Sequence, residues 1–180
     1  PMSGILGAAA LILYTLVYTP LKQKTPFAVF VGAFPGSIPP MLGCVAATEG
    51  FGTITLLAWL MFAVQFIWQF PHFWAIAWRV HDDYLKAGFK MLPSLGGRDK
   101  ASAFQIVVYT VGLIPVSLLP TFFGYTGNLS AVIAVIAGII FAMQAIKLYR
   151  TLSAEDAKNL MFGSFVYLPV VQIAYLIDKI

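Results

Sequence analysis

Six apolar stretches separated by short polar segments make up most of the chain. They cover residues 4–17, 27–48, 53–78, 103–123, 129–146 and 160–177. The last five contain 18 to 26 residues each, and a helix needs about 20 residues to cross the hydrocarbon core of a bilayer. Their apolar residues do not alternate with polar ones, as they would in a membrane β-barrel. The pattern predicts an all-α fold, a polytopic transmembrane helical bundle that forms a single domain over residues 1–180.

The composition is typical of an integral membrane protein. Hydrophobic residues make up 60% of the chain and charged residues 10%, against about 25% charged in soluble domains. The net charge is +4, but the basic residues lie beside the apolar stretches and form no tail or stripe. The sequence therefore predicts no nucleic-acid partner. The single cysteine, Cys44, allows no disulfide within the chain.

The basic residues are confined to alternate connections. Ten of the eleven Lys and Arg residues lie in segments 18–26, 79–102 and 147–159, and only Lys179 lies elsewhere. Cytoplasmic loops of membrane proteins carry such an excess of basic residues. We therefore predict a multi-pass protein of the cell's inner (cytoplasmic) membrane, with these three segments on the cytoplasmic side.

A polar stripe follows the third apolar stretch into the second basic segment. At 100° per residue, an arc of about 80° contains Gln65, Gln69, His72, Arg79 and Asp83. Aromatic residues cover much of the remaining helix surface, among them Trp74. Polar side chains within a span usually face the bundle interior or a wet cavity. The stripe predicts a substrate cavity open on the basic side, and hydrogen bonds between helices are the alternative for Gln69 and His72.

The second basic segment contains adjacent carboxylates. Asp82 and Asp83 supply the oxygen ligands that Mg²⁺ prefers, and Mg²⁺ is usually bound by one or two carboxylates together with phosphates and water. Lys86 and Lys90 add positive charge for phosphate oxygens. This set predicts a site for a lipid diphosphate, with a solvated loop as the alternative.

The first basic segment, "YTPLKQKTP", forms a second polar mouth on the same side. It contains Tyr18, Lys22 and Lys24. These residues either contribute to a diphosphate site or reflect membrane orientation alone.

Four motifs together resemble one enzyme family. The stretches "YTPLKQKTP", "GSIPPMLG", "QFPHFW" and "DDYLKAGFKMLP" occur in this order. In this combination the chain resembles, over its whole length, the protohaem IX farnesyltransferase (haem O synthase) family of the UbiA superfamily of prenyltransferases.

The resemblance implies a function and a site. It implies transfer of a farnesyl group from farnesyl diphosphate to a vinyl group of haem b, which makes haem O, with Mg²⁺ as the cofactor. Asp82 and Asp83 would bind the metal, and Lys86 would act with them. The diphosphate would be bound by Tyr18, Lys22, Lys24 and Lys86, and the haem or substrate cavity would include His72, Gln69, Trp74 and Arg79.

The resemblance also implies nine transmembrane helices and two Asp-rich loops, of which this chain would hold the last six helices and the second loop. We expect the first loop to lie upstream of Pro1 and the chain alone to be inactive. The family's second motif is usually DxxxD, but this chain has Arg79 four residues before Asp83. The ligand set therefore reduces to the adjacent pair of aspartates.

Other functions remain open from the sequence alone. Another UbiA-type aromatic prenyltransferase would share most of these features. An ion-coupled transporter would need acidic residues within its spans, and all seven acids lie in loops or at span ends. A haem-carrying subunit with two histidine ligands would need a partner for His72, and the only other histidine, His81, lies in a loop.

Overall fold

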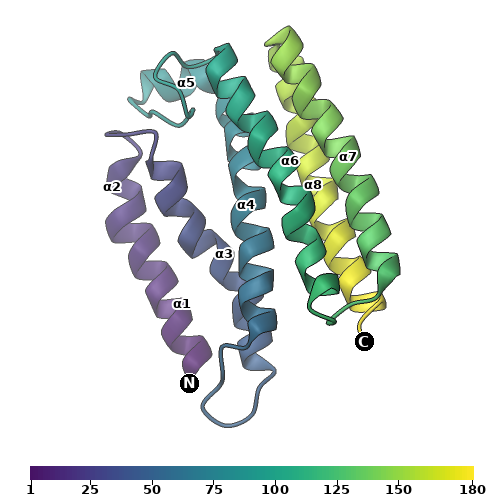
Figure 1. The fold of residues 1–180 in the computed structure, drawn as a ribbon. Helices are drawn as coiled ribbons and strands as arrows, with labels where there is room; N and C mark the ends of the chain where they lie inside the picture. Colours follow the sequence, from purple (N-terminus) through teal and green to yellow (C-terminus); the bar gives the residue numbers. More distant parts are fainter.

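The computed structural model describes residues 1–180 and consists of helices joined by short loops (Figure 1). In chain order they are α1 (Met2–Ile12), the π-helix η1 (Leu13–Tyr18), α2 (Thr19–Leu21), α3 (Ala28–Ala46), α4 (Leu56–Arg79), α5 (His81–Lys86), α6 (Lys100–Phe122), α7 (Asn128–Thr151) and α8 (Ala154–Ile177). The only β-type pairing is an isolated bridge between Thr126 and Lys179. The predicted all-α fold is confirmed.

Six helical segments are long and apolar enough to cross a membrane, as predicted. They are Met2–Leu21, Ala28–Ala46, Leu56–Arg79, Lys100–Phe122, Asn128–Thr151 and Ala154–Ile177. The first is longer than the predicted 4–17, because η1 and α2 continue α1 without a break. The short helix α5 was not predicted. It has only six residues and no apolar periodicity, so the sequence pattern predicted a loop at this position.

The π-helix η1 is a local widening of the first span. Pro20 follows it and has no backbone N–H, and the hydroxyl of Thr19 donates a hydrogen bond to the Tyr14 carbonyl five residues earlier at 2.9 Å. Such widened turns are rare and often occur at functional sites. Tyr18, the last residue of η1, is its only buried residue.

Side-chain caps define the starts of three spans. Thr55, Asp99 and Ser153 each accept a hydrogen bond from a backbone N–H in the first turn of α4, α6 and α8. These bonds satisfy donors that would otherwise lack a partner at a helix start. The residue types therefore explain where the spans begin.

Helix α4 lies at the centre of the bundle. It packs against α3 on one side and against α6 and α8 on the other, while α1 packs against α3 and α7 packs against α6 and α8. The main core joins these contacts and includes the fully buried Trp78, Phe70, Phe141 and Ile106. No residue of α1 is buried, so the first span lies at one edge of the bundle (Figure 1).

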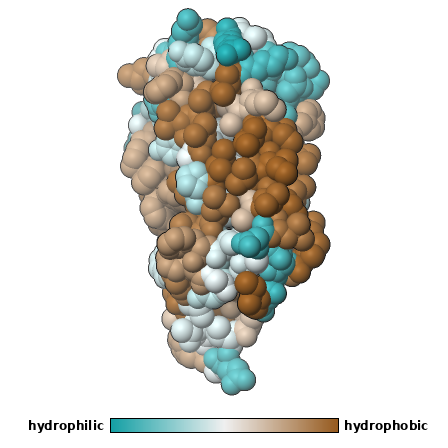
Figure 2. Space-filling view, turned by 45° about the vertical axis from the view of Figure 1, so that its right-hand side comes forward, coloured by the Kyte–Doolittle hydropathy of each residue, from teal (hydrophilic) through white to brown (hydrophobic).

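The outer surface is apolar between its two ends. Many large hydrophobic side chains of the spans are exposed, for example Leu16, Phe104 and Leu176. Figure 2 shows hydrophobic side chains over much of one face and hydrophilic side chains gathered at its upper end. Such a surface matches a lipid environment.

The three basic segments lie at one end of the bundle. The α2–α3 loop, α5 with its following loop, and the α7–α8 turn are all at the top of Figure 1, and both chain termini are at the bottom. The predicted alternation of loops is therefore confirmed. The polar residues of segments 18–26 and 79–102 therefore lie at the same end of the bundle.

Candidate active site

Helix α5 carries the adjacent carboxylates at the basic end. It starts just after α4 ends, and Asp82 and Asp83 lie in its first turn, where the partial positive charge of a helix start favours carboxylates. Their side chains are 72% and 77% exposed. Asp82 pairs with Arg98 at 3.1 Å and Asp83 with Lys86 at 3.5 Å. Exposed pairs of this kind contribute only about 0–1 kcal/mol, so incoming ions can replace them.

Arg98 fastens the α5–α6 loop to the end of α4. Its Nε donates to the Trp78 carbonyl at 2.6 Å and its Nη2 to the Arg79 carbonyl at 3.2 Å. Both carbonyls lie at the helix end, where the last turn lacks intrahelical donors. The same guanidinium also holds Asp82. Arg98 thus fixes the position of the first carboxylate relative to the central helix.

Lys22 lies in an aromatic cradle made by the first span. Its Nζ is 4.5 Å from the ring centroid of Tyr18 and 5.5 Å from that of Tyr14. A ring face attracts a cation with about 0.5–2 kcal/mol, depending on how far both are removed from water. Gly32 leaves room for the Tyr18 ring, because a Cβ at that position would come within 2.6 Å of it. Lys22 forms no ion pair with an acidic side chain and remains available to an anion.

The two candidate segments touch each other. The backbone N–H of Lys90 donates to the Lys22 carbonyl at 3.0 Å. Next to this contact lies a small cavity of about 200 Å³, lined by Pro26 from one segment and by His81 and Lys90 from the other. Lys24 is exposed on the same loop as Lys22. No hydrogen bond or ion pair joins Lys22 or Lys24 directly to the two aspartates.

His81 stands at the start of α5, beside this cavity. Burial and the nearby Arg98 guanidinium lower the pKa of its imidazole from the ordinary 6.5, and Asp82 opposes them in part. His81 is therefore neutral at pH 7. It adds no charge to the basic end.

The polar stripe of α4 is divided between two neighbouring helices. Gln69 is buried and donates to the Ala33 carbonyl at 3.0 Å and to the Ser37 hydroxyl at 2.7 Å, both in α3. His72 Nδ1 lies 2.7 Å from the Ser164 hydroxyl of α8, and its ring stacks on Trp68 at 4.4 Å. The sequence left two interpretations open for Gln69 and His72, a substrate cavity or hydrogen bonds between helices. The structure shows hydrogen bonds between helices for both residues.

The remaining cavity candidates lie at other positions along α4. Trp74 is buried and lines a groove of about 450 Å³ together with Phe70 and Tyr109. Arg79 is exposed at the end of α4. Gln69 and His72 line none of the three main cavities, so the structure does not gather these four residues around one cavity.

Comparison with known proteins bears on this arrangement. The chain matches the UbiA prenyltransferase family over residues 1–168. The chain belongs to the UbiA prenyltransferase family. This membership favours the prenyltransferase interpretation over an ion-coupled transporter or a haem-carrying subunit.

Individual members of the UbiA family give the same picture. The chain is 50% identical to the protoheme IX farnesyltransferase of Cytophaga hutchinsonii over 98% of its length, and 51% identical to that of Flavobacterium psychrophilum over 99%. It is 37% identical to the enzyme of that name from Bordetella avium over 99% of its length. The chain spans about 60% of the length of these relatives. No solved structure matches it.

The donor set at the basic end fits the metal expected for a UbiA-type enzyme. No group of three or more His, Cys, Asp or Glu side chains converges on one point. Mg²⁺, however, usually takes only one or two protein carboxylates and completes its shell with phosphate oxygens and water. Asp82 and Asp83, exposed and held by weak ion pairs, can supply that pair.

Two residues that contact this candidate site were missed by sequence reasoning. Tyr14 joins Lys22 through a π-helix, whose register differs from the 3.6-residue spacing assumed for helices. Arg98 pairs with Asp82, sixteen positions earlier in the chain, and no local pattern marks such a contact. The four-residue spacing of Tyr14, Tyr18 and Lys22 was the one pattern in the sequence that could have indicated that these three side chains lie close together.

Proposed function

We propose that the protein transfers a farnesyl group from farnesyl diphosphate to a vinyl group of haem b, forming haem O, at the cytoplasmic end of the bundle. The observation that carries the proposal is the high identity, over nearly the whole chain, to relatives named protoheme IX farnesyltransferase. The contact between the Lys22 loop and the Lys90 segment supports a diphosphate site there.

The diphosphate would lie between the first basic segment and α5. Lys22 offers an ammonium that is positioned by two tyrosine rings and is not used in an ion pair. Lys24 and Lys86 are exposed and add charge to the same end of the bundle. Fixed cations that face a leaving diphosphate stabilise the negative charge that develops on it as the C–O bond breaks.

Asp82 and Asp83 would hold Mg²⁺, which supplies further positive charge to the diphosphate. Arg98 keeps Asp82 in place, and Lys86 can exchange its weak bond to Asp83 for a phosphate oxygen. The positive charges of Arg98 and Lys86 thus offset the negative charges of the two carboxylates when no diphosphate is bound.

The reaction follows from the loss of diphosphate. The allylic C–O bond breaks, and its electron pair leaves with the diphosphate. The vinyl π-bond of haem then attacks the farnesyl carbon, and water adds to the resulting cation and loses a proton, which leaves a hydroxyl. Aromatic faces such as that of Trp74 attract the positive charge while it exists.

Haem contact remains the proposal for His72, Gln69, Trp74 and Arg79, although the four do not line one common cavity. His72 uses only Nδ1 for the bond to Ser164, and its other ring nitrogen makes no hydrogen bond. Arg79 is exposed at the basic end and can meet an acidic group of the macrocycle. Gln69 supports the site from the α3 side, where its bonds to Ala33 and Ser37 hold the two helices together.

Because we expect the chain alone to be inactive, the test is haem O formation in membranes that contain the full-length enzyme, with haem b, farnesyl diphosphate and Mg²⁺, followed by mass spectrometry. Asp82→Asn and Asp83→Asn should each lower the rate at least about 10²-fold, or about 2.7 kcal/mol of transition-state stabilisation. The control Glu49→Gln changes an exposed carboxylate at the other end and should leave the rate unchanged. Near-normal rates in both aspartate variants would remove the metal assignment, and prenylation of a different aromatic acceptor would favour another UbiA-type enzyme.

A further inference from the structure

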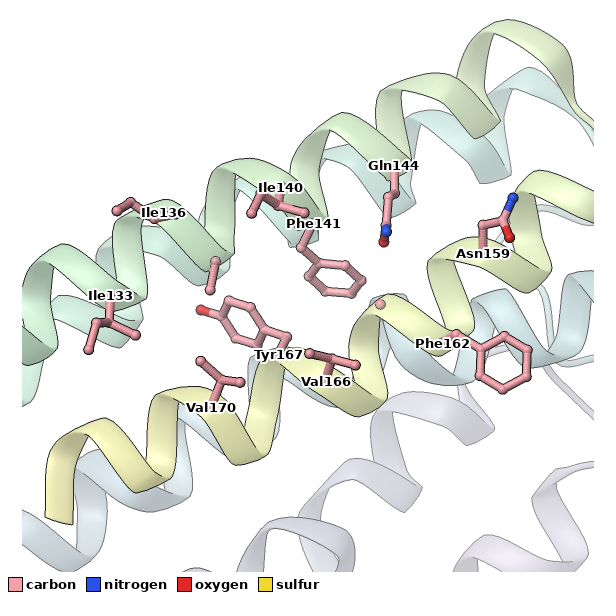
Figure 3. Close-up of a pocket in the computed structure, with 12 residues that line it drawn as sticks. Ile133, Ile136, Ile140, Phe141, Gln144, Asn159, Phe162, Val166, Tyr167 and Val170 are labelled. Atoms are coloured by element: carbon pink, nitrogen blue, oxygen red, sulfur yellow. The ribbon is translucent and has the colours of Figure 1, made fainter. Parts of the chain in front are cut away.

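A long groove separates α7 and α8 on the opposite side of α4 from α1 and α3 (Figures 1 and 3). Its volume is about 650 Å³, larger than the two cavities described above, and nine of its twelve lining residues are hydrophobic. Six of the labelled apolar side chains in Figure 3 are Ile133, Ile136, Ile140, Phe162, Val166 and Val170. None of the lining residues belongs to the candidate active site. The groove is therefore a separate feature of the protein.

The dimensions of the groove fit one extended chain. Along α7 it runs from Ile133 to Gln144, which is about 16 Å at 1.5 Å per residue. An extended chain of single bonds advances about 1.2 Å per bond. The groove is thus long enough for a chain of about fourteen bonds.

One end of the groove is polar because of an unsatisfied amide. Gln144 points from α7 toward α8, and its amide lies against Gly163, where a Cβ would collide with it (Figure 3). Its Oε1 is buried and has no hydrogen-bond partner. A buried polar group without a partner costs about 1–3 kcal/mol, and lipid supplies no water to compensate. Asn159, exposed at the same end, adds a second amide to the groove lining.

A hydroxyl is the group that satisfies this amide best. It both donates and accepts, so it can pair with the amide whichever of its two atoms faces the groove. A half turn of the amide exchanges oxygen and nitrogen at no cost in shape. A ligand with only hydrocarbon at this point would leave the amide unpaired.

The charges near this end favour an uncharged ligand. Lys147 pairs with Asp156 at 2.9 Å, and Lys158 pairs with Glu155 at 3.6 Å. Neither lysine lines the groove. Arg150, the other basic residue here, lies about 120° around α7 from Gln144 and does not line the groove. A phosphate or diphosphate head would therefore meet no cation in the groove lining.

We propose that the α7–α8 groove binds a long-chain alcohol dissolved in the membrane, with a chain of about fourteen bonds in the groove and its hydroxyl on the Gln144 amide. This site lies apart from the candidate active site, and the proposal does not depend on the proposed function. Linear and methyl-branched alcohols of this length belong to the same class of ligand.

The test uses a photoreactive, diazirine-bearing tetradecanol and the protein in phosphatidylcholine nanodiscs, with labelled peptides mapped by mass spectrometry. Labelling should be saturable and confined to α7 and α8. Unlabelled tetradecanol should compete at least about five-fold better than tetradecane or tetradecyl phosphate. Labelling that does not saturate, or equal competition by tetradecane, would mean that ordinary lipid chains fill the groove and would overturn the proposal. Stronger competition by tetradecyl phosphate would overturn it in favour of a charged ligand.

Matched variants locate the site and its polar contact. Ile140→Trp fills the groove and should lower labelling at least five-fold, whereas Ile139→Trp changes a neighbour of similar exposure, 49% against 51%, that does not line the groove. Gln144→Leu should keep chain binding but abolish the preference for tetradecanol over tetradecane, a five- to ten-fold change that equals about 1–1.4 kcal/mol. Equal labelling of both tryptophan variants, or an intact preference in Gln144→Leu, would contradict the proposal.

Discussion

Lys22 is the candidate diphosphate ligand whose surroundings the structure defines most closely. The rings of Tyr14 and Tyr18 hold its ammonium, and Gly32 gives the Tyr18 ring the space it occupies. A lysine on a flexible four-carbon stem otherwise loses much rotamer freedom when it binds an anion. The tyrosines reduce this cost because they order the side chain beforehand.

Lys22→Ala should therefore raise the KM for farnesyl diphosphate about ten-fold or more and raise the KM for haem much less, because only the diphosphate loses a charged partner. Steady-state kinetics of the full-length enzyme, with each substrate varied in turn, measures the difference. The control Lys179→Ala removes a basic residue at the other end of the bundle and should change neither constant. Equal effects of Lys22→Ala on both substrates would indicate a structural role for Lys22.

At the residue scale, the sequence indicated which residues are candidates for the site, but not which side chains they contact. Asp82, Asp83 and Lys22 became candidates because charged residues are rare in so apolar a chain and because they fall in recognisable motifs. The partners of Gln69 and His72 could not be predicted. A projection of one helix gives the direction of a side chain, but not which neighbouring helix lies in that direction.

Among the elements, α3 and α4 depend on a close approach at Gly36. A Cβ on this residue would collide with the Gln69 amide, which bonds to Ala33 and Ser37 on the same helix. Gly36→Ala should therefore displace the amide and destabilise the protein by about 1–2 kcal/mol, after the gain in helix propensity is subtracted. Thermal unfolding in detergent measures the change. Gly43→Ala, in the same helix with open space around the Cβ, should be neutral or slightly stabilising, and an equal loss in both variants would contradict this explanation.

The start of α6 should make stability depend on acid through Asp99. Hydrogen bonds from the Ser94 hydroxyl and the Ser102 backbone hold the pKa of Asp99 below its ordinary 3.8. A lowered carboxylate pKa stabilises the fold above pH 3.8, and this stabilisation is lost as the pH falls through the folded-state pKa. The lowered pKa of His81 also makes acid destabilising, but from pH 6.5 downward.

Comparison of Asp99→Ser with the unchanged protein cancels the contribution of His81. Serine still caps the helix but does not titrate in this range, so the two proteins should lose different amounts of stability between pH 5 and pH values below 3.8, with the larger loss in the unchanged protein. Asp99→Ala should cost about 1 kcal/mol at neutral pH. Identical pH profiles for Asp99→Ser and the unchanged protein would show that the carboxylate is not the titrating group.

The spans were predictable and α5 was not, for a physical reason. A membrane span must satisfy its backbone internally and be apolar over about 20 residues, so it leaves a strong signal in one sequence. Helix α5 has six residues and no buried ones. Its position depends on the hydrogen bonds from Arg98 to the end of α4, which are tertiary contacts.

For the whole molecule, the arrangement of the loops determines where the residues of the candidate active site lie. The Lys22 and Lys90 segments meet at one end although 67 residues separate them, because two complete spans, α3 and α4, lie between them and return the chain to the same side. This part of the architecture follows from span number and charge alone. The α7–α8 groove does not, because it results from how side chains such as Gln144 and residues such as Gly163 meet across two helices.

The membrane orientation of this end can be tested directly. The excess of basic residues predicts that the α2–α3 loop and α5 face the cytoplasm, where a water-soluble diphosphate head is accessible. After Cys44→Ser, single cysteines would be placed at the basic end (Gln23→Cys or Ala87→Cys) and at the opposite end (Glu49→Cys or Phe123→Cys). A membrane-impermeant maleimide should label the second pair in intact spheroplasts and the first pair only in inverted vesicles. Labelling of Gln23→Cys and Ala87→Cys from outside would place the candidate active site on the other face. Labelling of these two from different sides would contradict the six-span arrangement itself, because the hydrogen bond between Lys90 and Lys22 requires both segments at one end.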